Sequence, residues 1–415
     1  MHIRKITKGM RRTIAVFTSA AAVMGYVQYI KVNVPDTIYL DSYSGGTIDM
    51  ELPFVGTALC HDEGQAVTAS VNLMEPVVFS SGNASEHEVA LKLFGIWDVK
   101  HVTVSVGESR QVVACGIPVG IYIETDGILV VDVGEVETGS STIEAPAKGI
   151  LKPGDYIESV NGRTMDSINT LVDTISECRD YAVIGIRRDG ERIEVKIKPV
   201  QDGDGNGKIG VWVRDDCQGL GTLTYVDDKG DFGTLGHAIS DSSTGQMVEI
   251  KSGSLYTAHI WSVVKGESGT PGEVIGSINY GDDCYLGDIE DNCKIGVYGK
   301  ADEKVFAYVD EVYLPIAYKQ DIKKGDALIR TFVGGDVKDY HIDIEEVHFA
   351  ESYENKGIVF KVTDKELLEA TNGIVQGMSG SPIIQDGKVI GAVTHVFVNE
   401  PDKGYGIFIE NMLEH

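Results

Sequence analysis

Residues 377–384 read Gly-Met-Ser-Gly-Ser-Pro-Ile-Ile, and this stretch is the most informative part of the 415-residue chain. Gly377 and Gly380 permit positive φ and a close approach of the backbone on both sides of Ser379. Pro382 then leads into an apolar pair with the composition of a β-strand. The pattern predicts a sharp turn that presents a serine hydroxyl beside backbone N–H groups, as acyl-transfer enzymes require. An ordinary turn between two strands would give the same short string.

The sequence around this turn indicates a β-rich domain. Short apolar or alternating runs separated by glycine turns recur from about residue 209 to residue 415, with few long helical patterns between them. Examples are the runs at 223–226, 305–309, 357–362 and 389–396. This spacing is typical of a β-barrel or a pair of barrels. We therefore assign residues 201–415 to one C-terminal domain.

Composition narrows the class of partner. The net charge is −27, from 36 basic and 63 acidic residues, and such a surface repels phosphate backbones, so we expect no nucleic-acid partner.

The six cysteines form no C-x-x-C pair and no zinc spacing, and we expect neither a metal nor a cofactor. Cys284 and Cys293 are close enough in sequence for a local disulfide, and free thiols fit equally well. Asp202 begins a calcium-loop-like string, but Val213 occupies the position of the required glutamate.

The N-terminus carries a signal for export. Five basic residues precede an apolar stretch at 13–30, and this order is typical of a signal peptide or a signal anchor. We favour an uncleaved anchor within residues 1–31, which places the N-terminus in the cytoplasm and the bulk of the chain outside it. Residues 32–50 have the composition of a polar tether. Residues 51–113 alternate between apolar and polar, and predict a small β module without recognisable chemistry.

Residues 114–200 have a second recognisable pattern. The string Leu-Lys-Pro-Gly-Asp-x-Ile-x-x-Val-Asn-Gly at 151–162 resembles the core of PDZ domains, and a turn is predicted at 125–127. PDZ domains bind an extended peptide by adding it to a sheet edge. The resemblance implies that a strand before that turn lines the peptide groove. Its residues are Gly120, Ile121, Tyr122 and Ile123. A PDZ fold that serves only as a spacer is the alternative.

A serine nucleophile needs a base within hydrogen-bond reach. His237 lies among small residues, in Gly-Thr-Leu-Gly-His-Ala-Ile, which leaves room for a substrate. His395 lies inside an apolar strand pattern, and His259 is close to Trp261, so we interpret both as structural. His237 is therefore the candidate base.

Several stretches of the C-terminal half resemble the SpoIVB peptidase family. The resemblance is carried by residues 208–215, 219–224, 234–239, 373–383 and 391–398. The order of anchor, PDZ domain and peptidase agrees as well. The resemblance implies a serine endopeptidase with a chymotrypsin-like double β-barrel. By position, Ser379 matches the nucleophile, His237 the base and Asp364 the acid that orients the base, while the N–H groups of Gly377 and Ser379 would hold the oxyanion.

Two assignments keep alternatives. Asp364 is close to Ser379 in sequence for this fold, and it has the position of an N-cap for a helix beginning at residue 365. Other candidates for the acid are Asp231, Asp241 and Asp310. Ser381 is a rival nucleophile by spacing, but it directly precedes Pro382 and lacks a glycine two positions earlier, so we prefer Ser379.

The resemblance also implies a biological role. Members of the family are exported into the forespore intermembrane space, cleave themselves, and cut a regulator of the membrane complex that activates pro-sigma-K. We expect self-cleavage between Val32 and Ser44, with release from the membrane, and a PDZ domain that restrains the protease in cis and engages the membrane target in trans. Protein substrates, the chain itself and the membrane are thus the expected partners. The alternatives are an inactive PDZ scaffold of the envelope and a general envelope protease.

Overall fold

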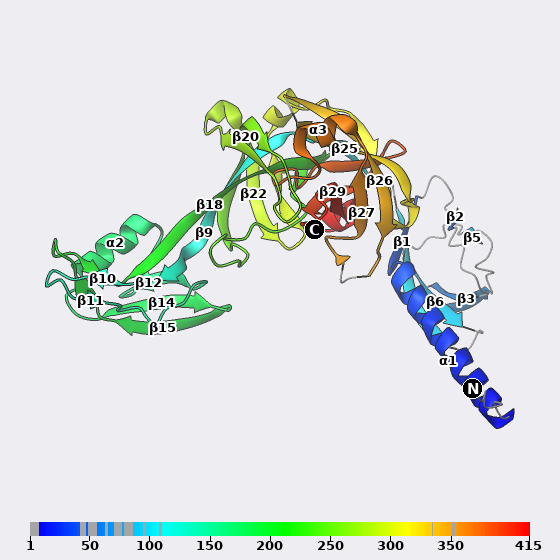
Figure 1. The fold of residues 1–415 in the computed structure, drawn as a ribbon, viewed down its shortest axis with the longest axis horizontal. Helices are drawn as coiled ribbons and strands as arrows, with labels where there is room; N and C mark the ends of the chain where they lie inside the picture. Colours follow the sequence, from blue (N-terminus) through cyan, green and yellow to red (C-terminus); the bar gives the residue numbers. More distant parts are fainter. Residues whose placement is uncertain are drawn as a thin grey trace, which may run out of the picture.

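The computed structural model describes residues 8–41, 47–48, 56–62, 65–69, 77–78, 86–93, 97–107, 110–333, 335–350 and 353–415. Four parts are arranged along the long axis of the molecule: an N-terminal helix, a small β module, two β-barrels, and a PDZ module at the opposite end (Figure 1). The chain is mainly β, as the sequence predicts.

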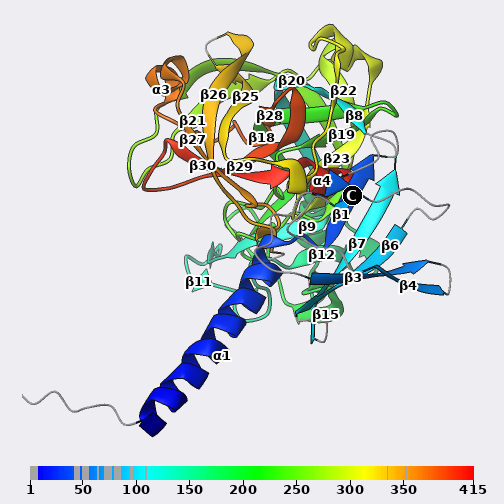
Figure 2. The ribbon, with the colours of Figure 1, turned by 90° about the vertical axis from the view of Figure 1, so that its right-hand side faces the viewer.

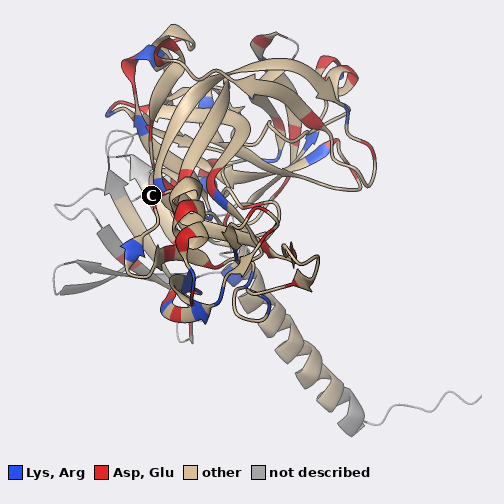
Figure 3. Cartoon of the chain, turned by 90° about the vertical axis from the view of Figure 1, so that its left-hand side faces the viewer, with Lys and Arg blue, Asp and Glu red and all other residues tan. Residues whose placement is uncertain are grey.

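The predicted apolar segment forms helix α1, Lys8–Asn33. Its Thr13–Asn33 part is long and apolar enough to cross a membrane, and only 6% of its most apolar window is buried within the fold. Figure 2 shows α1 extending away from the rest of the protein, and in Figure 3 no part of α1 has the red of Asp or Glu. A helix of this kind suits a membrane anchor or a signal sequence.

The small β module follows α1 and includes part of the predicted tether. Its five-stranded sheet has the order β1-β7-β6-β3-β4. The bounds are β1 Thr37–Asp41, β3 Gly56–Asp62, β4 Gln65–Ala69, β6 Glu86–Leu93 and β7 Trp97–Gly107, and the short strands β2 Thr47–Ile48 and β5 Val77–Val78 pair separately. β1 pairs in parallel with β7, and Ile38 is buried. The prediction of a polar tether is therefore wrong for Thr37–Asp41, while residues 42–46 and 49–50 lie outside the described residues.

Barrel one is a closed ring of six strands with the order β9-β20-β22-β23-β19-β18. The bounds are β9 Pro118–Val133, β18 Val211–Asp227, β19 Asp231–Thr234, β20 Ile250–Val264, β22 Tyr285–Cys293 and β23 Gly296–Ala301. Strands β8 (Gln111–Ala114), β24 (Tyr313–Pro315) and β21 (Glu273–Ile278) extend its sheet. Short 3-10 turns are Asp282–Cys284, Glu303–Ala307 and Lys319–Asp321. The core contains Ile121, Ile123, Leu223 and Leu255.

The PDZ module is inserted into barrel one, because β9 and β18 run on from the barrel into it (Figure 1). The remaining bounds are β10 Val136–Glu137, β11 Ile143–Glu144, β12 Tyr156–Val160, β13 Arg163–Thr164, α2 Ile168–Glu177, β14 Ala182–Arg188, β15 Glu191–Ile197, β16 Val200–Gln201 and β17 Gly207–Lys208. Ile128 and Val130 belong to its core, whereas Ile121 belongs to the core of barrel one. The predicted PDZ boundary at residue 114 is therefore too early.

Contacts within this module explain why the Lys-Pro-Gly-Asp string ends in an aspartate. The Asp155 carboxylate is only 1% exposed, accepts a hydrogen bond from Lys152 N at 2.8 Å, and pairs with both Nε and Nη2 of Arg188 at 2.7 Å. A buried carboxylate needs such partners, since an unpaired one would be costly. Asp155 thus ties the turn before β12 to strand β14.

Barrel two has the closed order β25-β26-β27-β30-β29-β28. The bounds are β25 Gly325–Val333, β26 Asp336–Val347, β27 Ile358–Val362, α3 Lys365–Thr371, β28 Pro382–Gln385, β29 Lys388–Val396, β30 Lys403–Phe408 and α4 Ile409–Leu413. Its core is a single apolar cluster that includes Phe360, Ile383 and Val393. A second cluster, with Tyr225 and Tyr298 of barrel one and Ile384 and Ile407 of barrel two, joins the two barrels.

Candidate active site

The nucleophile turn enters β28 at the junction of the two barrels. Gly377 has φ +100° and Gly380 has φ +94°, values that favour glycine. A Cβ on Gly380 would collide with Thr222 O and lie 2.7 Å from Leu235 N, both in barrel one. Gly380, one of the two glycines predicted to permit close approach, is therefore required, because the backbone of barrel one packs directly on it.

Ser379 is partly exposed, and its surroundings include free backbone donors. Its Oγ donates a hydrogen bond to Thr394 O at 2.8 Å. The carbonyl of Gly377 accepts from Thr222 Oγ1 at 2.9 Å, and that of Ser379 accepts from Thr222 N at 3.0 Å. No hydrogen bond among the described residues uses the N–H of Gly377 or of Ser379. The turn thus offers two free donors to an oxyanion, and Thr222 holds the adjoining peptide groups that carry the carbonyls of Gly377 and Ser379.

Ser381 has a different environment. It is fully buried, and its Oγ is hydrogen-bonded to Thr331 Oγ1 at 2.8 Å inside barrel two. A side chain without access to solvent cannot meet a peptide substrate, so this geometry favours Ser379 over Ser381.

His237 comes from a strained loop that leaves β19. Leu235 and Gly236 have φ +68° and +69°, and a left-handed Leu is uncommon enough to suggest a functional constraint. A Cβ on Gly236 would lie 2.7 Å from Thr394 Cγ2, so this loop and the Ser379 hydrogen bond meet at the same residue. His237 Nδ1 is 2.9 Å from Ala238 O. Because only an Nδ1–H can donate to that carbonyl, the bond leaves Nε2 as the basic nitrogen.

Burial lowers the pKa of His237 below its ordinary value of 6.5, and the Ala238 carbonyl opposes this change in part. The imidazole is thus neutral near pH 7, as a general base must be. No hydrogen bond among the described residues joins Ser379 to His237. Both segments meet at Thr394, whose carbonyl accepts from the Ser379 hydroxyl and whose methyl group packs against Gly236, the residue before His237.

His395, interpreted from sequence as structural, lies beside the candidate base. The ring centroids of His237 and His395 are 5.1 Å apart. Burial, helped by His237 and Lys356, lowers the pKa of His395 to about 4, and its buried Nδ1 has no hydrogen-bond partner among the described residues. The signal for its position is the β28–β29 hairpin, which returns Thr394 and His395 to the nucleophile turn.

No hydrogen bond or ion pair among the described residues joins Asp364 to His237. Asp364 is the N-cap of α3, where its carboxylate accepts from Leu367 N at 3.1 Å and from His341 N at 3.4 Å. The implied contact between Asp364 and the base is therefore absent, and the N-cap alternative is confirmed. Of the substitutes, Asp231 pairs with Lys300, and buried Asp241 pairs with Arg214 and accepts from Ser243 N and Thr244 N. Asp310 has no side-chain hydrogen bond or ion pair among the described contacts.

The predicted PDZ groove is wrong. Tyr122 and its neighbours Gly120, Ile121 and Ile123 pair on one edge with β18 and on the other with β20, so no edge remains for a peptide. In the PDZ module, the first residues of β18, Val211 to Arg214, pair with β9 on one edge only among the described strands. The other edge faces α2, whose Ile168 N donates to Asp215 Oδ2 at 2.8 Å. That edge is the candidate peptide groove.

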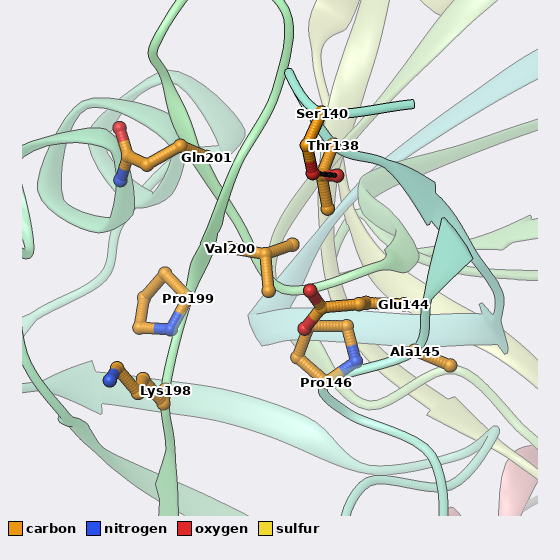
Figure 4. A pocket seen from close by; sticks show the side chains of 9 residues that line it. All are labelled: Thr138, Ser140, Glu144, Ala145, Pro146, Lys198, Pro199, Val200 and Gln201. Atoms are coloured by element: carbon orange, nitrogen blue, oxygen red, sulfur yellow. Dashed lines mark hydrogen bonds between the residues drawn. The ribbon is translucent and has the colours of Figure 1, made fainter. Parts of the chain in front are cut away.

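A metal or ligand site elsewhere is not evident in the described part of the chain. Asp291, Cys293 and His415 bring three ligand types within 4.8 Å of one another, but the two ring nitrogens of His415 face different partners, Asp291 and Cys293. Cys284 and Cys293 are both free thiols. A cavity of about 590 Å³ lies in the PDZ module between the β10–β11 hairpin and residues 198–201, and it contains none of the candidate catalytic residues (Figure 4).

Comparison with known proteins identifies the family. The model of the SpoIVB peptidase S55 family matches residues 205–413, which is half of the chain. The chain belongs to this family. It is therefore a serine peptidase, and its two six-stranded barrels are the chymotrypsin-like fold expected of it.

Other similarities cover smaller parts. The Rv3671c protease from M. tuberculosis in its active form is 13% identical with a TM-score of 0.29, covering 48% of this chain and 72% of that one. The PDZ domain of an SdrC-like protein from Listeria innocua is 28% identical with a TM-score of 0.19, covering 21% and 94%. The probable membrane metalloprotease ARASP2 of Arabidopsis thaliana is 35% identical over 107 residues, which are 24% of this chain and 22% of that relative.

Proposed function

We propose that Ser379 is the nucleophile and His237 the general base of this membrane-associated serine endopeptidase. The observation that carries the proposal is the junction at Thr394, where the nucleophile turn of barrel two and the strained His237 loop of barrel one meet. Both side chains come from segments whose local conformation is fixed by the opposite barrel. Such a site is preorganised by the packing of the barrels.

In the reaction, Ser379 Oγ leaves the Thr394 carbonyl and donates its proton to His237 Nε2 while it attacks a peptide carbonyl carbon. The new oxyanion is held by the N–H groups of Gly377 and Ser379. His237 then passes the proton to the leaving amine, and water releases the acyl group by the reverse sequence. The Ala238 carbonyl holds the tautomer, a task that a carboxylate performs in other enzymes of this fold.

Labelling with a fluorophosphonate probe tests this proposal. Oγ of the nucleophile forms a bond to phosphorus, fluoride leaves, and the proton passes to the base. We expect the full-length protein in detergent to be labelled, and the Ser379→Ala and His237→Gln proteins to remain unlabelled while still folded. Labelling that persists in Ser379→Ala, or that is lost only in Ser381→Ala, would sink the assignment of Ser379. A folded wild-type protein that is never labelled would favour the inactive scaffold.

The proposed biological role is that of a sporulation signalling protease, which cleaves itself and a regulator of the complex that activates pro-sigma-K. Membership of the SpoIVB family supports this role. An anchor at α1 would hold the enzyme at the membrane that carries such a complex, and cleavage between Val32 and Ser44 would release it. β1 spans Thr37–Asp41, so cleavage within these residues requires the strand to leave its pairing with β7.

Membranes carrying the wild-type or the Ser379→Ala protein provide the test of self-cleavage. We expect only the wild type to yield a soluble form, with a new N-terminus between residues 32 and 44. A released form that begins after Gly120 would contradict the proposed site. Co-expression with the candidate regulator, followed by its loss in a Ser379-dependent manner, tests the substrate.

Contacts between the PDZ module and the His237 loop support regulation in cis. Arg214, at the start of β18, pairs with Asp241, whose carboxylate holds the turn at 243–244. A Cβ on Gly154 of the PDZ module would lie 2.6 Å from Gln246 Cδ in the same loop. A peptide bound at the β18 edge would act on the segment that carries Arg214, and so on the loop that follows His237.

A further inference from the structure

The hairpin of β20 and β21 connects barrel one to the nucleophile turn of barrel two. The first half of β20 pairs with β9 and β22 inside barrel one. From Ala258 to Val264 it pairs with β21 alone among the described strands. Val263 and Val274, from the two arms of this hairpin, pack against the core of barrel two. One continuous strand therefore runs from the first barrel to the second.

The hairpin holds the residue directly before Gly377. Gln376 N donates to Gly272 O at 2.8 Å, and Gln376 O accepts from Val274 N at 2.8 Å. These two bonds fix both peptide groups of Gln376, one of which contains the N–H of Gly377. A Cβ on Gly377 would lie 2.9 Å from Val274 Cβ, so the valine side chain rests on Gly377 Cα.

The tip of the hairpin, residues 265–272, makes further hydrogen bonds to the segments on both sides of the site. Before the turn, Gly266 N donates to Thr371 O at 3.0 Å, and Asn372 Nδ2 donates to Gly266 O at 2.7 Å. Beyond β29, Gly269 N donates to Val398 O at 2.8 Å, and Ser268 Oγ donates to Asn399 O at 3.0 Å. The tip thus spans from the segment before Ser379 to the segment that follows His395.

We infer that Val274 is a positioning residue for the peptidase reaction, which with Gly272 aims the N–H of Gly377 at the oxyanion. The inference rests on the proposed roles of Ser379 and Gly377. Oxyanion donors are effective because they are oriented before the charge develops, and removing one costs about 10²–10³-fold in rate. Val274 acts on the direction of one donor and touches no reacting atom, so its truncation costs less than the loss of that donor.

Fluorophosphonate inactivation of the full-length protein in detergent tests the inference, because the phosphoryl oxygen occupies the oxyanion site. We expect Val274→Ala to lower kinact about tenfold with KI unchanged, and Val274→Pro, which also removes the N–H bonded to Gln376, to lower it about 100-fold. Val274→Thr keeps the branched shape and restores the rate. The matched control is Ile275→Ala, since Ile275 is the next residue and is 43% exposed.

Thermal unfolding of each variant separates positioning from folding. If Val274→Pro fails to fold, Val274→Ala carries the test. A Val274→Ala protein that is folded and labelled at the wild-type kinact, or that loses rate only through KI, overturns the inference while leaving Ser379 as the nucleophile. Absence of labelling at Ser379 in the wild type would instead overturn the proposed function on which the inference rests.

Discussion

The ring of His237 lies against the ring of His395, with centroids 5.1 Å apart and planes tilted by 43°. The two residues come from different barrels, one from the loop after β19 and the other from β29. Both imidazoles have a lowered pKa, chiefly because of burial. The neutral ring of His395 therefore shields the ring of the proposed base from water.

This relationship predicts different effects for two substitutions of His395. His395→Ala removes this shielding ring, so the pKa of His237 rises toward its ordinary value of about 6.5. The fall of the labelling rate at acidic pH then moves to higher pH. His395→Phe keeps an aromatic ring against His237 and leaves the acidic fall of the labelling rate at the same pH. The measurement is the fluorophosphonate labelling rate against pH for both proteins. Equal shifts in the two variants would show that an imidazole nitrogen, rather than burial, is what matters.

The lowered pKa of His237 also sets the pH dependence of the wild type. A general base must be neutral, and a lowered pKa keeps the ring neutral to more acidic pH. On acidification from pH 8, we expect the labelling rate to fall with a midpoint below about 6.5, the ordinary histidine pKa. Labelling across this range provides the check. A midpoint at or above pH 6.5 would contradict the burial of the base.

Asp364 should behave as a helix cap rather than as a triad acid. Because its carboxylate accepts from Leu367 N, Asp364→Ala should lose about 1 kcal/mol of unfolding free energy, while Asp364→Ser, which retains a capping oxygen, should lose less. Both should be labelled within about twofold of the wild-type rate. Denaturant unfolding and labelling are measured together. A fall of about 10⁴-fold in a folded Asp364→Ser protein, the size expected for a triad carboxylate, would contradict this.

The fold was predictable where local patterns decide it. Alternating runs and glycine turns indicate the barrels, and the Lys-Pro-Gly-Asp string indicates the PDZ module because it is needed locally, for the buried Asp155 turn. The string at 125–127 has turn composition, yet β9 continues through it. Gly127 takes φ +93°, and Asp126 N donates to Glu249 O at 2.9 Å, so a tertiary partner keeps the chain extended. The PDZ boundary could not be placed without that partner.

In the candidate site, too, the residues marked by local sequence were predictable and those that depend on tertiary contacts were not. Ser379 and His237 stand out because their glycine-rich surroundings are local in sequence. Asp364 is a poorer assignment, because an N-cap and a triad acid require the same residue type and only tertiary structure distinguishes them. His395 is missed because an apolar strand hides a histidine whose partner comes from the other barrel. Such contacts depend on how the barrels pack, and no local pattern encodes them.

Ser381 provides a final test, since it is adjacent to the site yet part of the core. Its hydroxyl is buried and bonded to Thr331, so Ser381→Ala leaves a buried threonine hydroxyl without this partner and should cost about 1–3 kcal/mol of unfolding free energy. The labelling rate should be unchanged. Adding Thr331→Val removes the orphaned hydroxyl with little change of shape, and should restore most of the stability. Denaturant unfolding of the single and double variants measures the coupling. Loss of labelling in a stably folded double variant would mean that the Ser381 hydroxyl takes part in the chemistry.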